Sequence, residues 1–454
     1  MPNAAGSDES AAAVGALGTG SVHTDPVDTG SGTGSVGTVE TRFLDLPGPV
    51  PLDCGRELSE VRVAYETYGR LSPARDNVIL VCHALSGDAH AAGVSATAPA
   101  AGTRDGFAAE DRDGTAGAGL GWWDGMIGPG KAFDTDRYHV VSTNLLGGCR
   151  GTTGPSSTDP GTGRPYGPDF PVVTVADLVR VQRRFLDGLG IERLAAVAGG
   201  SLGGMQALQW AILFPDQVDA IVVIASTHAL HPQGLAWNAI ARAAIMGDPA
   251  WQDGRYHGTG RSPDAGMGVA RMIGHVTYLS AAALRAKFDR RLQNGGDIRH
   301  TLTEPEYAVE SYLDHQASSF VKRFDANTYL YLSRALTYFD LARQHGDGSL
   351  ERALSGVRAR TLLIAFSSDW LYPPSASEEI AEALDGLGKP VEYHLIEAPY
   401  GHDSFLLEEG RQIPIVRRFL GGSATEALAG SATEVLTDGT TEAHPATEQT
   451  TRSP

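Results

Sequence analysis

The stretch that decides the fold is LAAVAGGSLGGMQALQW, residues 194–210. An apolar run ends in two glycines, a serine stands at the turn, and an apolar helical pattern begins at Leu202. Gly199 to Gly203 match G-x-S-x-G, the pattern of a tight strand-to-helix turn that lifts a serine hydroxyl above the end of a sheet. The stretch predicts Ser201 as a nucleophile and the Leu202 amide as a donor to an oxyanion, in preference to a purely structural glycine turn.

Short apolar runs alternate with helical patterns on both sides of this stretch. Seven runs predict strands, at residues 61–69, 77–84, 138–146, 194–200, 220–226, 361–366 and 391–398. Several of them are apolar without alternation, which is typical of strands buried on both faces. Helical patterns at residues 174–190 and 201–214 lie between strands. The order predicts an α/β fold with a mostly parallel sheet flanked by helices.

The strand signals place the core in two parts of the chain. Residues 41–228 form the first part and residues 358–421 the second. Residues 229–357 between them carry several helical patterns and no convincing strand. We expect this insertion to form a helical lid over the carboxyl ends of the strands, where open α/β sheets bind their ligands.

Three further segments have a composition that is poorly suited to packing. Residues 1–40 and 422–454 are rich in Gly, Ala, Ser and Thr and contain no aromatic residue. Such segments cannot bury enough apolar surface to offset the entropy of ordering, so we expect two disordered tails. Residues 91–121, rich in Gly, Ala and Asp, predict a flexible surface insertion within the core.

Composition argues against several classes of protein. A formal charge of -18 over 454 residues is unfavourable for a nucleic-acid binder, which needs clustered Lys and Arg. The chain has no uncharged apolar stretch of about 18 residues that would predict a membrane span, and its first residues do not resemble a secretory signal. Cys54, Cys82 and Cys149 lack metal-site spacing and cannot form a complete disulfide framework. We therefore expect a cytoplasmic protein with reduced thiols, and Cys82 as a buried residue of the core.

A catalytic serine on such a turn needs a base and an orienting acid, in the chain order serine, acid, histidine. Asp369 follows the apolar strand at residues 361–366 through a short turn, so we expect it at a strand's carboxyl end rather than as an ordinary surface turn residue. His402 lies just after the last predicted strand and before the final helical pattern. Ser201, Asp369 and His402 therefore form the predicted triad.

The segment CHALSG, residues 82–87, follows another predicted strand and would supply a second oxyanion donor from the Leu85 amide. Together with the triad it predicts an acyl-transfer site. The residues leave open whether water or an alcohol accepts the acyl group.

Over residues 42–421 the sequence resembles the homoserine O-acetyltransferase family, whose members have the α/β-hydrolase fold and act in methionine biosynthesis. The resemblance rests on HALSGDAH (83–90), GWWDGMIGPGKAFDTDRYHVVSTNLLGGCRGTTGPSS (121–157), AGGSLGGMQALQW (198–210), RMIGHVTYLS (271–280), FDANTYLYLSRALTYFD (324–340), SSDWLYPP (367–374) and YGHDSF (400–405). The segments around the serine and at residues 144–157 are much more specific than G-x-S-x-G alone.

The resemblance implies a role for each matching residue. Ser201 is the nucleophile, Asp369 the orienting acid and His402 the general acid and base. Arg271 and Asp403 bind the amino-acid substrate, and a guanidinium suits the carboxylate of L-homoserine as a carboxylate suits its ammonium. The implied reaction is ping-pong transfer of acetyl from acetyl-CoA through an acyl-enzyme. The family also implies a homodimer joined through the lid helices, with no metal and no tightly bound cofactor.

Three alternatives remain open on the sequence. The first is the same enzyme class with another donor or acceptor, such as homoserine or serine O-succinyltransferase. The second is an esterase or thioesterase that uses the triad on water, although Arg271 and Asp403 would then have no zwitterion to bind. The third is a non-enzymatic binding protein, which the complete triad disfavours.

Overall fold

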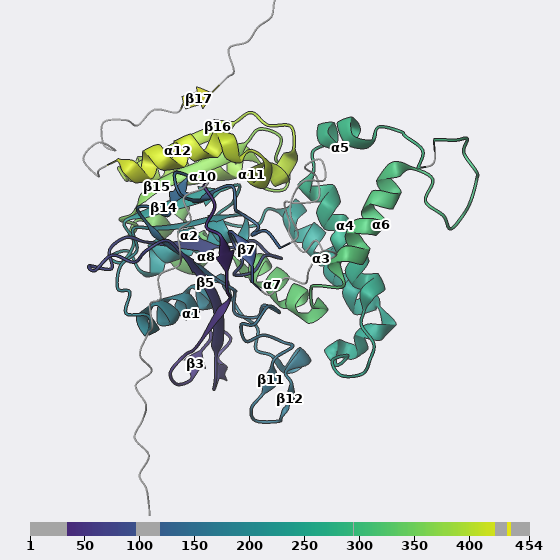
Figure 1. Cartoon of the computed structure of the whole chain (residues 1–454), viewed down its shortest axis with the longest axis horizontal. Coiled ribbons are helices and arrows are strands. Elements are labelled where there is room, and N and C mark those ends of the chain that lie inside the picture. Colours follow the sequence, from purple (N-terminus) through teal and green to yellow (C-terminus); the bar gives the residue numbers. More distant parts are fainter. Residues whose placement is uncertain (1–33, 97–118, 294, 423–433, 437–454) are drawn as a thin grey trace, which may run out of the picture. The chain divides into compact units, whose positions relative to one another are not determined.

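The computed structural model describes residues 34–96, 119–293, 295–422 and 434–436 (Figure 1). Its centre is a nine-stranded sheet. In order across the sheet the strands are β17 (Glu434–Leu436), β16 (Val391–Ile396), β15 (Arg360–Phe366), β14 (Ala220–Ile224), β13 (Ala196–Gly200), β6 (Val78–Cys82), β10 (His139–Thr143), β5 (Arg62–Tyr68) and β2 (Arg42–Asp45). All seven predicted strands are in this sheet, which confirms the α/β prediction.

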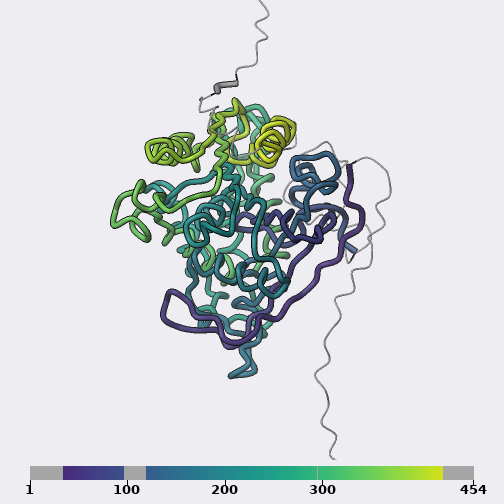
Figure 2. Tube along the Cα trace, turned by 90° about the vertical axis from the view of Figure 1, so that its left-hand side faces the viewer, coloured from purple at the N-terminus to yellow at the C-terminus, as the bar shows by residue number. Residues whose placement is uncertain are grey.

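Neighbouring strands from β17 to β10 are parallel, whereas β5 pairs antiparallel with β10 and β2 pairs antiparallel with β5. The purple N-terminal strands and the yellow-green C-terminal strands therefore lie at opposite edges of the sheet (Figure 2). Because parallel strands end at the same edge, the loops after β6, β13, β15 and β16 meet there. These loops carry Leu85, Ser201, Asp369 and His402.

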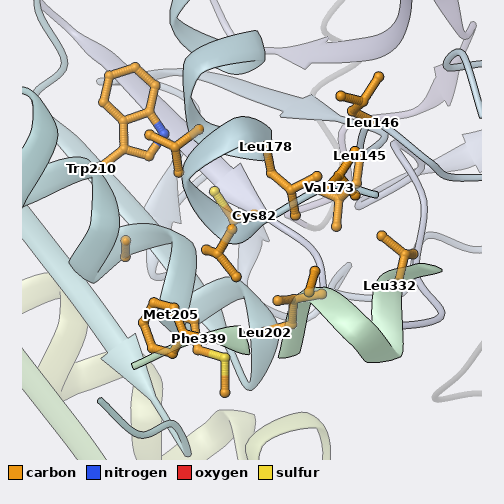
Figure 3. Close-up of a cluster of buried hydrophobic side chains, with 14 of the residues drawn as sticks. Cys82, Leu145, Leu146, Val173, Leu178, Leu202, Met205, Trp210, Leu332 and Phe339 are labelled. Carbon is orange, nitrogen blue, oxygen red and sulfur yellow. The ribbon is translucent and has the colours of Figure 1, made fainter. Parts of the chain in front are cut away.

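Helices cover both faces of the sheet. The helices α1 (Val175–Gly188), α2 (Leu202–Leu213) and α10 (Pro374–Gly386) belong to one buried cluster, and α12 (Glu409–Gly421) belongs to another on the opposite side. Thr174 caps α1 through a reciprocal pair of hydrogen bonds with Asp177, which satisfies backbone donors at the helix start. Figure 3 shows part of the first cluster, where Cys82, Leu202, Met205 and Trp210 pack together.

In its described part, the region expected to be a lid contains helices joined by turns and irregular stretches, with two isolated bridges and no strand. Its helices are α3 (Pro232–Gly247), α4 (Asp264–Tyr278), α5 (Ala281–Phe288), α6 (Ala308–Phe320), α7 (Ala326–Tyr338), α8 (Leu341–His345), α9 (Leu350–Leu354) and the 3-10 helix η2 (Pro249–Gly254). The helices α3 to α6 stand to one side of the sheet (Figure 1). The helices α3, α4, α6 and α7 all contribute buried residues to the main core cluster, among them Ile245, Met267, Phe320 and Leu332, so the region packs as a continuation of the core.

The predicted tails and insertion lie mostly outside the described residues. At the N-terminal side, β1 (Thr38–Val39) pairs with β7 (Val94–Ser95), so the expectation of a tail up to residue 40 is wrong for its last residues. The same pairing orders the start of the segment 91–121. At the C-terminal side, β17 adds a strand to β16 within the segment expected to be a tail. In each case short β-pairing supplies backbone hydrogen bonds that composition does not reveal.

The remaining short elements are β3 (Val50–Pro51), β4 (Glu57–Leu58), β8 (Ile127–Gly128), β9 (Phe133–Asp134), β11 (Thr158–Asp159), β12 (Arg164–Pro165), η1 (Gly167–Asp169), η3 (Gly401–Asp403) and α11 (Ser404–Leu407). Within the described ranges, no helix is both long enough and apolar enough to cross a membrane.

Candidate active site

Ser201 stands at the sharp turn between β13 and α2. Its φ of 58° lies in the left-handed region that a non-glycine residue rarely adopts, as in a strained turn that projects a side chain. A Cβ at Gly203 would lie 2.1 Å from the Cys82 carbonyl oxygen, and one at Gly199 would lie 2.5 Å from the Gly203 backbone. Both glycines are therefore required for the close approach of β13, α2 and β6. The turn has the geometry of a nucleophile elbow.

Asp369 is held by three hydrogen bonds just after β15. Its Oδ1 accepts from the backbone N–H groups of Leu371 at 3.0 Å and Tyr372 at 2.9 Å. Its Oδ2 lies 2.8 Å from Nδ1 of His402. The carboxylate is almost fully buried. Because both oxygens have partners, Asp369 has a fixed orientation toward the histidine.

His402 lies in η3, after β16, and its ring is buried. The ring packs against those of Tyr372, Phe405 and Tyr278, with centroid separations of 5.0, 5.3 and 6.1 Å. A carboxylate at Nδ1 favours the tautomer in which Nδ1 carries the proton. Nε2 is then the nitrogen that can accept a proton from a nucleophile.

Two cavities meet at Ser201. Cavity 1 is lined by Ala84, Leu85, Ser86, Gly87, Trp122, Ser201, Tyr278, His402, Asp403, Phe405 and Leu406. Cavity 2 is lined by Leu85, Ser201, Leu230, Gly234, Trp237, Asn238, Ile273, Gly274, Thr277, Tyr278, Tyr329, Leu336, Leu371 and Tyr372. Their volumes, open mouths included, are about 470 and 500 Å³. Among the described residues, only Leu85, Ser201 and Tyr278 line both cavities, so Ser201 stands between two different surroundings.

The loop after β6 is shaped by a buried histidine. His83 donates from Nδ1 to the Ala84 carbonyl at 2.6 Å and accepts at Nε2 from the Leu145 N–H at 3.2 Å. Burial lowers the pKa of His83, which favours this neutral, bridging form. The Gly87 N–H closes the turn on the Ala84 carbonyl at 3.1 Å. This arrangement brings Leu85 to the wall shared by both cavities, as an oxyanion role would require.

Both predicted substrate residues interact with Tyr278. Asp403 lines cavity 1. Arg271 on α4 is buried, with its Cζ 4.6 Å from the centre of the Phe320 ring and 6.0 Å from that of Tyr278, and it is not among the residues that line either cavity. Burial raises the pKa of Tyr278, while the charge of Arg271 lowers it and that of Asp403 raises it. The charges of Arg271 and Asp403 therefore both act on Tyr278, which lines both cavities.

Sequence reasoning missed Tyr278 and Tyr372 as parts of the site. Tyr278 lies seven residues after Arg271 on one helix, a spacing that places two side chains on the same face, so its position could have been read from the sequence. The position of Tyr372 in the site depends on the turn that follows Asp369, and no helical or strand periodicity in the sequence indicates it. The interpretation of Cys82 as a core residue is confirmed, because its thiol is buried and burial raises its pKa.

Comparisons with known proteins agree with this geometry. A family described as alpha/beta hydrolase fold matches residues 77–409. A homoserine O-acetyltransferase of Methanococcus vannielii is 47% identical over 393 residues, covering 87% of this chain and 75% of that protein. A homoserine O-succinyltransferase of Alkalilimnicola ehrlichii is 49% identical over 396 residues, covering 86% of this chain and 97% of that protein.

Solved structures are similar as well. The crystal structure of homoserine O-acetyltransferase from Bacillus anthracis has a TM-score of 0.74 and 30% identity, covering 84% of this chain and 98% of that chain. The structure of esterase E22 has a TM-score of 0.72 and 31% identity, covering 84% of this chain and all of that chain (100%). The relatives thus share one fold and carry names that differ in acyl group and in acceptor.

Proposed function

The chain belongs to the homoserine O-acetyltransferase family of the alpha/beta hydrolase fold, and from this premise we propose that it transfers acetyl from acetyl-CoA to the hydroxyl of L-homoserine. The observation that carries the proposal is the placement of Ser201 between two cavities, with the bonded pair of Asp369 and His402 beside it. A ping-pong enzyme needs such a nucleophile, which donor and acceptor reach in turn.

In the first half-reaction His402 Nε2 takes the proton of Ser201, and Oγ attacks the thioester carbonyl of acetyl-CoA. The tetrahedral oxyanion accepts hydrogen bonds from the amides of Leu85 and Leu202. Its collapse breaks the carbon–sulfur bond, and the proton on His402 goes to the departing CoA thiolate. Asp369 stabilises the imidazolium that forms between these steps. The product is free CoA and an acetyl ester on Ser201.

In the second half-reaction the homoserine hydroxyl gives its proton to His402 and attacks the acetyl ester. Collapse of the second tetrahedral intermediate returns the proton to Ser201 and releases O-acetyl-L-homoserine. Asp403 in cavity 1 pairs with the substrate ammonium, and Arg271, next to the ring of Tyr278, supplies the positive charge for its carboxylate. The acceptor therefore binds on the cavity 1 side.

The acyl group and the adjoining part of the donor enter from cavity 2. Among the described residues that line cavity 2, none carries a charge. The terminal carboxylate of a succinyl group would be buried there without a cation, which is costly, whereas an acetyl group meets suitable apolar surroundings. The lining of cavity 2 thus supports acetyl over succinyl as the transferred group.

The test is initial CoA release from acetyl-CoA, with and without L-homoserine, followed by mass spectrometry of the product. Homoserine-dependent release with O-acetyl-homoserine as product is the expected result. Release that is indifferent to homoserine would make the protein a thioesterase. Faster turnover with succinyl-CoA than with acetyl-CoA would contradict the assignment of the donor.

We also propose a cytoplasmic homodimer joined through the lid helices. Ile240 and Met246 on α3 and Val269 on α4 are exposed apolar side chains, and α3 packs against α4, which is consistent with an interface there. The proposed reaction requires no tightly bound cofactor, since Ser201 carries the acyl group and His402 transfers the protons. Light scattering at micromolar concentration should give the dimer mass, and a single monomeric species would overturn the proposal.

A further inference from the structure

One tyrosine contacts all three members of the triad. The backbone N–H of Tyr372 donates to Oδ1 of Asp369 at 2.9 Å. Its ring packs on that of His402 with the centroids 5.0 Å apart. Its side chain and that of Ser201 both line cavity 2, and an interaction with this serine lowers the pKa of the phenol. The proposed mechanism assigns no role to this residue.

The surroundings of Tyr372 leave its hydroxyl little freedom. The side chain is only 5% exposed and lines cavity 2 beside Ser201. The backbone of Tyr372 is also held in place, because Oδ1 of Asp369 accepts hydrogen bonds from the N–H groups of Leu371 and Tyr372 in one tight turn. The phenol is therefore attached to the same turn that orients the histidine. The phenol of Tyr372 therefore cannot shift without moving the Asp369 turn and the ring of His402.

We propose that Tyr372 is a positioning residue, whose hydroxyl donates to Oγ of Ser201 and holds this side chain at the junction of the two cavities. With that hydrogen bond in place, the serine keeps its own proton directed toward His402 Nε2. Without it, the side chain can distribute over its staggered rotamers, and a smaller fraction of molecules is ready to react.

The hydroxyl is suited to donate and not to exchange its proton. Burial raises the pKa of Tyr372 well above its ordinary value, and the nearby Asp369 charge raises it further. The phenol therefore remains protonated at any pH at which the enzyme works. A phenylalanine at this position would preserve the ring packing on His402 and the backbone bond to Asp369, and would remove only the contact to Ser201.

The experiment compares Tyr372→Phe with Tyr331→Phe, a matched loss of a partly buried tyrosine hydroxyl. Tyr331 bonds the Pro168 and Phe170 carbonyls and lines neither cavity. The pre-steady-state burst of p-nitrophenol from p-nitrophenyl acetate gives the acylation rate per active site, with burst amplitude counting the sites. We expect Tyr372→Phe to slow acylation about five- to tenfold, as loss of one hydrogen bond to the reacting atom predicts. KM for L-homoserine should not change.

An unchanged acylation rate per site in Tyr372→Phe, with only a lower melting temperature like that of Tyr331→Phe, would overturn the proposal and leave a purely structural role. The probe ester needs neither CoA nor homoserine. The result therefore depends on Ser201 as nucleophile and not on the identity of donor or acceptor. Failure of the acetyltransferase assignment would appear in product analysis, while the burst would still report on Tyr372.

Discussion

Cavity 1 and cavity 2 share a nucleophile but differ in chemistry. Cavity 1 carries the carboxylate of Asp403, the imidazole of His402 and the hydroxyl of Ser86. The described lining of cavity 2 is apolar apart from hydroxyl and amide groups. The difference teaches how one serine can serve two substrates in turn. In the proposed reaction, the zwitterionic acceptor binds on the charged side and the neutral acyl group on the other.

The strongest test of this comparison removes the shared atom. Ser201→Ala should abolish CoA release with and without homoserine, with a loss on the order of 10⁴-fold or more. Both half-reactions need Oγ, so both should fail together. Stopped-flow or continuous thiol assays measure the rates. Residual homoserine-dependent transfer near the wild-type rate would mean that Ser201 is not the nucleophile.

The next test removes the charge of cavity 1. Asp403→Asn should lower kcat/KM for L-homoserine on the order of 100-fold, because the substrate ammonium loses its charged partner. The burst of CoA release should be retained. Asp347→Asn, at an exposed carboxylate, is the matched control and should behave as the wild type. An equal loss in both half-reactions would show that Asp403 supports the triad rather than the acceptor.

A smaller effect is expected when a charge is added to cavity 2. Asn238→Arg should raise the ratio of kcat/KM for succinyl-CoA over acetyl-CoA about tenfold, since a charge-assisted hydrogen bond of about 1.4 kcal/mol corresponds to that factor. Asn238→Met, of similar length without charge, should leave the ratio as in the wild type. No difference between the two variants would place the acyl group outside cavity 2.

The smallest effect concerns His275, which lies on α4 with its ring 5.8 Å from that of Tyr278. Burial, followed by the charges of Arg271, Lys287 and Arg323, lowers its pKa to about 2. A depressed histidine pKa means that its stabilising contribution is present above the ordinary value of 6.5 and is lost as pH falls from there toward 2.

His275→Gln should therefore weaken the loss of stability on acidification, by a slope of up to about one proton. The glutamine oxygen can still accept from Tyr312, whose hydroxyl bonds Nδ1 of the histidine at 3.0 Å. Unfolding in urea at several pH values measures the slope, and the pH profile of kcat/KM should keep its midpoint. A shifted midpoint would show that His275 titrates within the working range and contributes to the charge of the acceptor side.

Much of the fold could be read from the sequence, because buried parallel strands leave continuous apolar runs. The runs that form β6, β14 and β15 are such cases, and the glycines beside Ser201 predict the turn by residue type alone. Short edge pairings were not predictable in this way. The strands β1 and β17 have only two and three residues and no apolar periodicity, so only their partners reveal them.

The sequence by itself determined the identity of the predicted nucleophile, acid and base, since strand, turn and residue type coincide at Ser201, Asp369 and His402. Only the tertiary structure decided what surrounds them. Tyr278 and Tyr372 reach the serine from a helix and a turn far from it along the chain, and Arg271 packs against the rings of Phe320 and Tyr278, outside the described walls of both cavities. The physical reason is that a cavity is a property of how elements pack. Local patterns specify each element's shape, but the space left between elements depends on side chains that meet only after folding.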